Sequence, residues 1–336
     1  MQTSKKLLIR LSSAGDVLLT SPLLKLIKER EPESEIHFVV KSQYADIIRS
    51  NPNVSEVHIV QDHADFHQLE NLRRILIAEK FSITLDLHNN FRSVYLRRGT
   101  APTVRVIKKE IVKRAILANS RLNLFTAPRT VALKYANTFD KSVTSVPRPE
   151  LYFPESVLKK ADTIWGSFGA DERESVFLCP GARHFTKRWP VQYWKKLGKK
   201  LSERKRIVLL GGIEDAEACR DIQSGTNILN FSGQLSLLES SAMLRHAAAV
   251  VTNDSYLMHA ANALGVKTVA IFGSSVKEFG FFPYKVEHRI MEVNGLTCRP
   301  CSHIGLEACP KRHFKCMMDT TPDEVESAIA SLLSPS

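Results

Sequence analysis

Asn253-Asp254-Ser255-Tyr256-Leu257-Met258-His259 is the stretch that decides the fold of this chain. It follows the apolar run Ala249-Val250-Val251 and precedes a helical pattern and a second apolar run, residues 268–272. This order predicts a strand, a helix and a parallel strand, with the first N–H groups of the helix pointing at the strand tips. An anionic ligand would bind there, although Asp or Ser can also cap a helix purely for stability.

A second motif also follows an apolar run that is predicted to be a strand. Pro180-Gly181-Ala182 and then Lys187-Arg188-Trp189-Pro190 follow the apolar run Val176-Phe177-Leu178. Loops that follow parallel strands meet at the same edge of a sheet, so we expect both motifs to serve one ligand.

Apolar runs alternate with helical patterns along most of the chain, which predicts an α/β protein with doubly wound parallel sheets. The expected strands are residues 6–11, 35–40, 56–60, 82–87 and 103–107 in the first half, and 176–178, 206–210, 228–231, 250–251 and 269–271 in the second. Residues 142–154, with three prolines and little apolar periodicity, are predicted to link two domains.

Length and composition agree with two domains. The 336 residues exceed the usual single-domain size, and 43% hydrophobic residues are enough for two cores. The chain has no apolar stretch of about 18 residues and no signal-peptide profile, so a cytoplasmic protein is expected. Six cysteines in such a chain argue against a disulfide framework.

The net charge of +12 is concentrated in one segment. Between Arg92 and Lys141, twelve lysines and arginines face two acidic residues. Such a block suits an anionic partner, namely nucleic acid, an anionic membrane face or an acidic acceptor, or it is simply a solvated face. The few aromatic residues there form no recognisable nucleic-acid motif, so nucleic acid is not the expected partner.

Together with Ser13-Ala14-Gly15-Asp16-Val17-Leu18, the two motifs resemble the lipopolysaccharide heptosyltransferases of glycosyltransferase family 9, from about residue 5 to about residue 333. The resemblance implies a GT-B fold of two facing Rossmann-like domains. Residues 1–150 would bind the acceptor and residues 151–321 the nucleotide sugar. A C-terminal helix, residues 322–336, would pack back on the first domain.

The resemblance also implies the reaction. Heptose would pass from ADP-heptose to the lipopolysaccharide inner core, on Kdo-lipid A or heptosyl-Kdo-lipid A, with inversion and without a metal or other cofactor. The enzyme would work peripherally at the inner face of the cytoplasmic membrane. The alternatives are a GT-B epimerase or a transferase of another sugar, and a basic nucleic-acid-binding module.

Two residues carry the implied chemistry. Asp16 would be the base that deprotonates the acceptor hydroxyl, and Lys187 would stabilise the leaving diphosphate. The implied donor-binding residues are Gly181, Ala182, Lys187, Glu217, Asp254, Ser255, Tyr256, Leu257 and His259. The implied acceptor-binding residues are Ser13, Arg92, Arg97 and Arg98.

Two details stay open. Tyr256 stands where the family pattern has glycine, so it could crowd the donor. An acidic residue after Gly211-Gly212 would contact the ribose, and Glu214 and Asp215 are candidates beside Glu217.

Four cysteines cluster near the C-terminus, at Cys298, Cys301, Cys309 and Cys316. A C-x2-C pair with two further cysteines nearby is typical of a structural zinc site. Reduced thiols in a loop or an adventitious disulfide are the alternatives. Such a zinc ion would be remote from the transfer chemistry.

Overall fold

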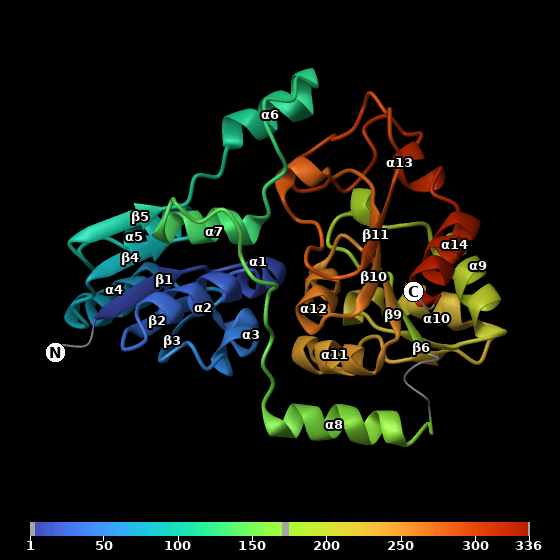
Figure 1. Ribbon diagram of the computed structural model, residues 1–336, viewed down its shortest axis with the longest axis horizontal. Helices are drawn as coiled ribbons and strands as arrows, with labels where there is room; N and C mark the ends of the chain where they lie inside the picture. The colour runs from blue at the N-terminus through green and yellow to red at the C-terminus, as the bar shows by residue number, and fades with distance from the viewer. Residues whose placement is uncertain (1–3, 170–174, 335–336) are drawn as a thin grey trace. The chain divides into compact units, whose positions relative to one another are not determined.

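The computed structural model describes residues 4–169 and 175–334, which form two α/β units, each built on a parallel sheet (Figure 1). Contacts assign Met1–Lys109 and Thr130–Tyr152 to the first unit, and Glu110–Arg129 and Phe153–Ser336 to the second. The chain therefore passes between the units three times, and part of the basic segment belongs to the second unit. The predicted fold class, two Rossmann-like units with parallel sheets, is confirmed.

The first sheet has the strand order β3-β2-β1-β4-β5. Its strands are β1 (Lys5–Ile9), β2 (Glu35–Lys41), β3 (Glu56–Val60), β4 (Ile83–Asp86) and β5 (Thr103–Val106). Its helices are α1 (Ala14–Leu18), α2 (Ser21–Arg30), η1 (Ser42–Tyr44), α3 (Asp46–Arg49), α4 (Phe66–Ala78), α5 (Phe91–Leu96) and α7 (Val131–Phe139). Central strand β1 is buried on both faces, as parallel strands require, and α4 and α5 cover the face that Leu7 and Ile9 share.

The second sheet has the order β11-β10-β9-β6-β7-β8. Its strands are β6 (Ser175–Cys179), β7 (Arg206–Leu209), β8 (Leu229–Asn230), β9 (Ala249–Asn253), β10 (Lys267–Phe272) and β11 (His288–Glu292). The helices of this unit are α6 (Ile111–Ser120), α8 (Glu155–Gly166), η3 (Phe185–Lys187), α9 (Val191–Ser202), η4 (Ile213–Asp215), α10 (Ala216–Gln223), α11 (Leu237–Met243), η5 (Leu244–His246), α12 (Tyr256–Leu264), η6 (Lys277–Phe279), α13 (Lys315–Met318) and α14 (Pro322–Leu333).

The C-terminal helix belongs to the second unit. Val325, Ile329 and Leu332 of α14 are buried in one core with Trp194 of α9 and Val251 of β9. The apolar stripe of this helix therefore packs against the sheet of its own unit, and the return of the helix to the first domain stays a prediction. Within residues 4–169 and 175–334, no helix has the length and apolar character needed to cross a bilayer.

Candidate active site

Asp16 lies just after β1, in the short helix α1, and its carboxylate is held by three neighbours. Oδ1 accepts from Arg10 at 2.8 Å and from the Tyr135 hydroxyl at 3.0 Å, while Oδ2 accepts from the Ser13 hydroxyl at 2.9 Å. Burial alone would raise the pKa of Asp16, but the Arg10 guanidinium and these hydrogen bonds outweigh burial and lower it. The Asp16 carboxylate is therefore ionised, and its orientation is fixed by these neighbours, as a general base requires.

The predicted acceptor-binding residues have different surroundings. Ser13 bonds directly to Asp16. Arg97 donates to the fully buried carboxylate of Asp86 at 2.6 Å, which places it in the framework of the unit. Arg92 is half-buried, and Arg98 is exposed. The structure thus brings only Ser13 to Asp16.

His88 follows β4 at the same edge of the sheet and was missed by the sequence analysis. Burial, together with the nearby charges of Arg10 and Lys109, lowers the pKa of its imidazole to about 4. A neutral imidazole beside the Arg10–Asp16 pair can accept or donate a hydrogen bond without adding charge. The polar run His88-Asn89-Asn90 after an apolar strand was the available signal.

Lys187 and Asp254 lie at the centre of the predicted donor-binding residues. The Lys187 ammonium lies 2.7 Å from Asp254 Oδ2, which also accepts from the Ser275 hydroxyl at 2.6 Å. Burial alone would raise the pKa of Asp254, but Lys187 outweighs burial and lowers it. The two motifs that the sequence analysis expected to converge therefore meet through a buried ion pair.

Asn253 joins these loops and was missed as a functional residue. Its amide donates to the Pro180 carbonyl at 2.6 Å, and its carbonyl accepts from the Trp189 backbone N–H at 3.2 Å. Arg188 adds a bond to the Ala182 carbonyl at 2.6 Å. The strand-end position of Asn253 was visible in the sequence, but its partners 64 and 73 residues away were not.

Close packing explains the glycines of the donor motifs. A Cβ atom at Gly181 would collide with the Asp215 carboxylate, and one at Gly211 would lie 2.9 Å from the Asp215 Cβ. Asp215 is buried and accepts from the Gly212 N–H at 3.0 Å. The predicted ribose contact Glu217 is exposed in the first turn of α10, so the structure separates these two acidic candidates by burial.

The start of α12 carries the remaining predicted donor residues. Ser255 is its N-cap, and Leu257 and His259 are buried in its first two turns. The Tyr256 hydroxyl accepts from Ser241 of α11 at 3.0 Å, and burial raises its pKa. Its side chain is thus directed at α11, which lessens the crowding expected at the helix start.

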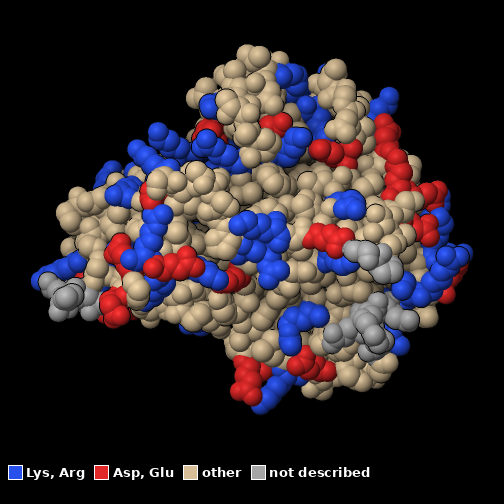
Figure 2. All heavy atoms as spheres, in the orientation of Figure 1, with Lys and Arg blue, Asp and Glu red and all other residues tan. Residues whose placement is uncertain are grey.

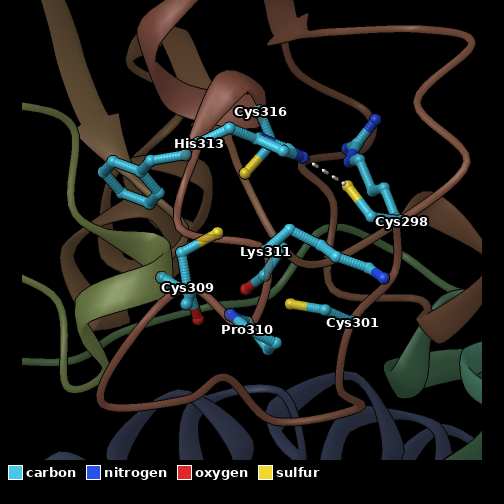
Figure 3. Close-up of a pocket in the computed structure, with 11 residues that line it drawn as sticks. Cys298, Cys301, Cys309, Pro310, Lys311, His313 and Cys316 are labelled. Atoms are coloured by element: carbon cyan, nitrogen blue, oxygen red, sulfur yellow. Dashed lines mark hydrogen bonds between the residues drawn. The ribbon is translucent and has the colours of Figure 1, made fainter.

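The four clustered cysteines line one small cavity with His313 (Figure 3). Cys298 Sγ lies 3.6 Å from His313 Nε2, and burial raises the pKa of the Cys316 thiol to about 12. In the described residues, no three of these donor atoms lie within 4.8 Å of one another. The four thiols that the sequence analysis assigned to a structural zinc site thus line one cavity, and the zinc site stays a prediction.

The sequence pattern of glycosyltransferase family 9 (heptosyltransferase) matches residues 69–310. The chain belongs to this family. It is therefore a glycosyltransferase, as the motifs predicted. It is 26% identical over 349 residues to lipopolysaccharide heptosyltransferase 2 of Salmonella typhimurium, covering 98% of this chain and 99% of that protein.

Solved structures of the family share the fold. The family 9 glycosyltransferase of Veillonella parvula superposes with a TM-score of 0.81 at 20% identity, covering 99% of this chain and 98% of that one. The ADP-heptose lipopolysaccharide heptosyltransferase II of E. coli gives 0.75 at 23% identity, covering 98% of each chain. A second E. coli heptosyltransferase, solved with ADP-2-deoxy-2-fluoro heptose, gives 0.68 at 19% identity, covering 97% and 99%.

Proposed function

We propose that this glycosyltransferase transfers heptose from ADP-heptose to the lipopolysaccharide inner core, with inversion and without a catalytic metal. Family membership supports the reaction class, and the fluorinated ADP-heptose in a relative supports the donor. The match to heptosyltransferase 2 favours heptosyl-Kdo-lipid A over Kdo-lipid A as acceptor.

The observation that carries the proposal is the buried pair of Lys187 and Asp254 beside the start of α12. A donor diphosphate would accept from the backbone N–H groups there and would draw the ammonium away from Asp254. The positive end of the helix and Lys187 would then share the charge that develops as the sugar leaves. Gly181 and Ala182 would contact the sugar nucleotide, and Glu217, Glu214 or Asp215 would contact its ribose.

Asp16 is the proposed base. Its low pKa makes it a modest proton acceptor but keeps it fully ionised at neutral pH. Arg10 and Tyr135 fix the direction of Oδ1, and Ser13 fixes that of Oδ2. Arg92 and Arg98 would contribute positive charge for an anionic acceptor, with Arg97 acting through Asp86.

Binding of ADP tests the donor role of Lys187. We expect Lys187→Ala to weaken ADP binding in calorimetry by about tenfold or more, because a charge-assisted contact worth roughly 1.5–3 kcal/mol is lost. Lys195→Ala, at an exposed ion pair with Asp221, is the matched control and should bind as the wild type does. Equal ADP affinity in both folded variants would remove Lys187 from the site.

Asp16→Asn tests the base. This variant should bind ADP-heptose as tightly as the wild type and lose transfer by about 10²–10⁴-fold, because general-base catalysis contributes that much. Asp46→Asn, at an exposed side chain of α3, is the control. Product formation at the wild-type rate by Asp16→Asn would rule out Asp16 as the base.

We also propose that the enzyme works at the cytoplasmic face of the inner membrane. Ile111 and Val112 of α6 are 64% and 70% exposed, and Lys113 follows them directly. Exposed apolar side chains beside cations suit an anionic bilayer surface. Lysine and arginine side chains are spread over the face of the molecule that Figure 2 shows, in keeping with the net charge of +12.

A further inference from the structure

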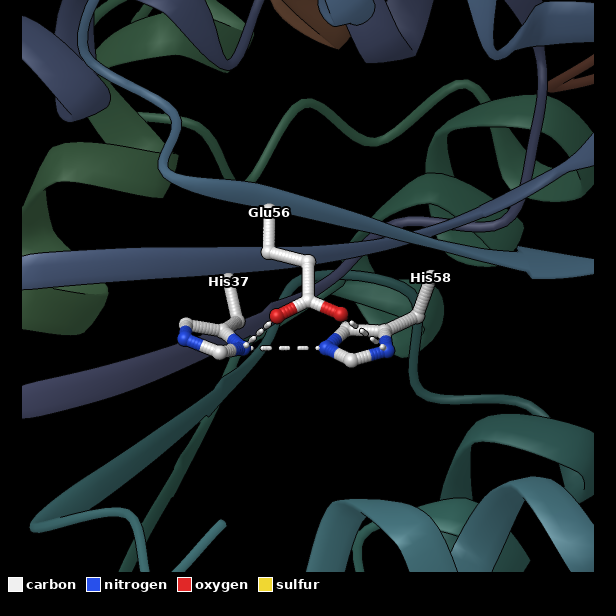
Figure 4. Close-up of side chains that lie close together, drawn as sticks. All are labelled: His37, Glu56 and His58. Carbon is white, nitrogen blue, oxygen red and sulfur yellow. Dashed lines mark hydrogen bonds and ion pairs between the residues drawn. The ribbon is translucent and has the colours of Figure 1, made fainter.

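A second cluster of polar side chains lies in the first unit, on the face of the sheet that α4 covers. His37 Nδ1 and His58 Nε2 are 3.0 Å apart, and Glu56 Oε2 lies 3.5 Å from the same His37 nitrogen (Figure 4). Across residues 4–169 and 175–334, this is the one group of three or more His, Cys, Asp or Glu donors within 4.8 Å of one another.

The sheet register creates the cluster. His37 of β2 pairs with Glu56 of β3, and His58 follows two residues later on the same face. These positions are at the N-terminal ends of the strands, whereas Asp16 follows the C-terminal end of β1. The cluster is therefore separate from the proposed catalytic residues.

We propose that His37, Glu56 and His58 bind one divalent transition-metal ion of the zinc class, with water completing its coordination. Zinc bound at about 2.0–2.1 Å to tetrahedral ligands places those ligands roughly 3.3 Å apart. The two separations from His37 Nδ1, 3.0 Å to His58 Nε2 and 3.5 Å to Glu56 Oε2, bracket that value. Two imidazoles and a carboxylate are a donor set that suits zinc and related ions.

The outer contacts fit the same site. His37 Nε2, which would face away from the ion, is 3.9 Å from Glu35 Oε2. Carboxylates near the distal nitrogen are the usual means of orienting a ligating histidine. The Phe81 ring also packs edge-on against His37 at 5.0 Å, which fixes the imidazole plane.

Charge and access favour a cation. Glu35, Glu56 and Glu79 lie near the two imidazoles, and the Lys5 ammonium pairs with Glu79 and lies near Glu35. The histidines are only 3% and 6% exposed, but the Glu56 side chain is 54% exposed, so an ion can enter beside it.

Zinc chloride titration of the full chain tests the site. We expect Glu56→Gln to weaken one zinc-binding event by about tenfold to a hundredfold, and His58→Asn to abolish it. His67→Asn, at an exposed histidine of α4, should leave it intact. The paired variant Cys298→Ser, Cys301→Ser should also keep this event, which separates it from binding by thiols.

Thermal unfolding gives a second readout. Zinc should raise the melting temperature of the wild type and of His67→Asn, and should leave that of Glu56→Gln nearly unchanged, because only the folded site binds the ion. Glu56→Gln alters an exposed side chain and should fold even if His58→Asn does not. Identical zinc stoichiometry, affinity and melting shift in the wild type and Glu56→Gln would overturn the proposal.

Discussion

Asp16 is a largely enclosed carboxylate whose ionised form depends mainly on one cation. The Arg10 guanidinium lies 2.8 Å from Oδ1, and without it the loss of solvent around Asp16 would favour the protonated acid. We therefore expect Arg10→Gln to raise the pKa of Asp16 and to move the acid limb of kcat/KM upward by about one to three pH units. A pH–rate profile measures this shift.

The link between protonation and folding fixes how the stability contribution of Asp16 depends on pH. The folded-state pKa of Asp16 is depressed, so its contribution to stability is complete above the unfolded-state pKa and is lost as pH falls through the folded value. Arg10→Gln should lose that contribution already at neutral pH. Arg74→Gln, at an exposed pair with Glu70, is the control, and an unchanged acid limb in Arg10→Gln would contradict the argument.

The packing around Gly181 explains why this position is a glycine. Because a Cβ there would collide with the buried Asp215 carboxylate, we expect Gly181→Ala to lower the free energy of unfolding by about 1–3 kcal/mol and to weaken ADP binding. Gly166→Ala, where a Cβ meets nothing within 4 Å, should be neutral or slightly stabilising. Denaturant unfolding compares them, and equal stabilities would show that the Asp215 loop simply yields.

At the scale of elements, α14 stabilises the second unit. Leu332 is fully buried against that core, so Leu332→Ala should destabilise the protein by about 2–5 kcal/mol in denaturant unfolding. Leu122→Ala removes the same atoms from a side chain that is 58% exposed and should change stability little. Similar losses in both variants would mean that the helix is not part of the folded core.

The sequence predicts where strands and helices lie along the chain better than which residues they contact in the folded protein. Apolar runs located the strands β1 to β10, and central strands such as β1, β6 and β9 are the clearest cases because they are buried on both faces. The edge strand β11 has mostly half-buried side chains and no such run, so it was not predicted. Motif residues were found, but the Tyr135 contact to Asp16, 119 residues away, and the packing partner of α14 depend on tertiary structure.

The whole molecule combines two separately cored units with an excess of positive charge, +12 at neutral pH. Much of that excess lies in residues 92–141, which extend from the first unit through α6 of the second. The charge would attract the anionic lipid face, and exposed Ile111 and Val112 would enter its interface. Salt should therefore weaken the electrostatic attraction of the basic residues to the membrane more than the insertion of Ile111 and Val112.

Vesicle sedimentation separates the two contributions. The wild type should bind vesicles containing anionic lipid, and binding should fall by several-fold when salt is raised from about 0.1 to 1 M, since screening shortens the Debye length from roughly 10 to 3 Å. Ile111→Ser with Val112→Ser should weaken binding at both salt concentrations, while Ile213→Ser, at a 77% exposed residue of η4, should not. Equal binding of the α6 variant and the wild type would place the membrane contact elsewhere on the molecule.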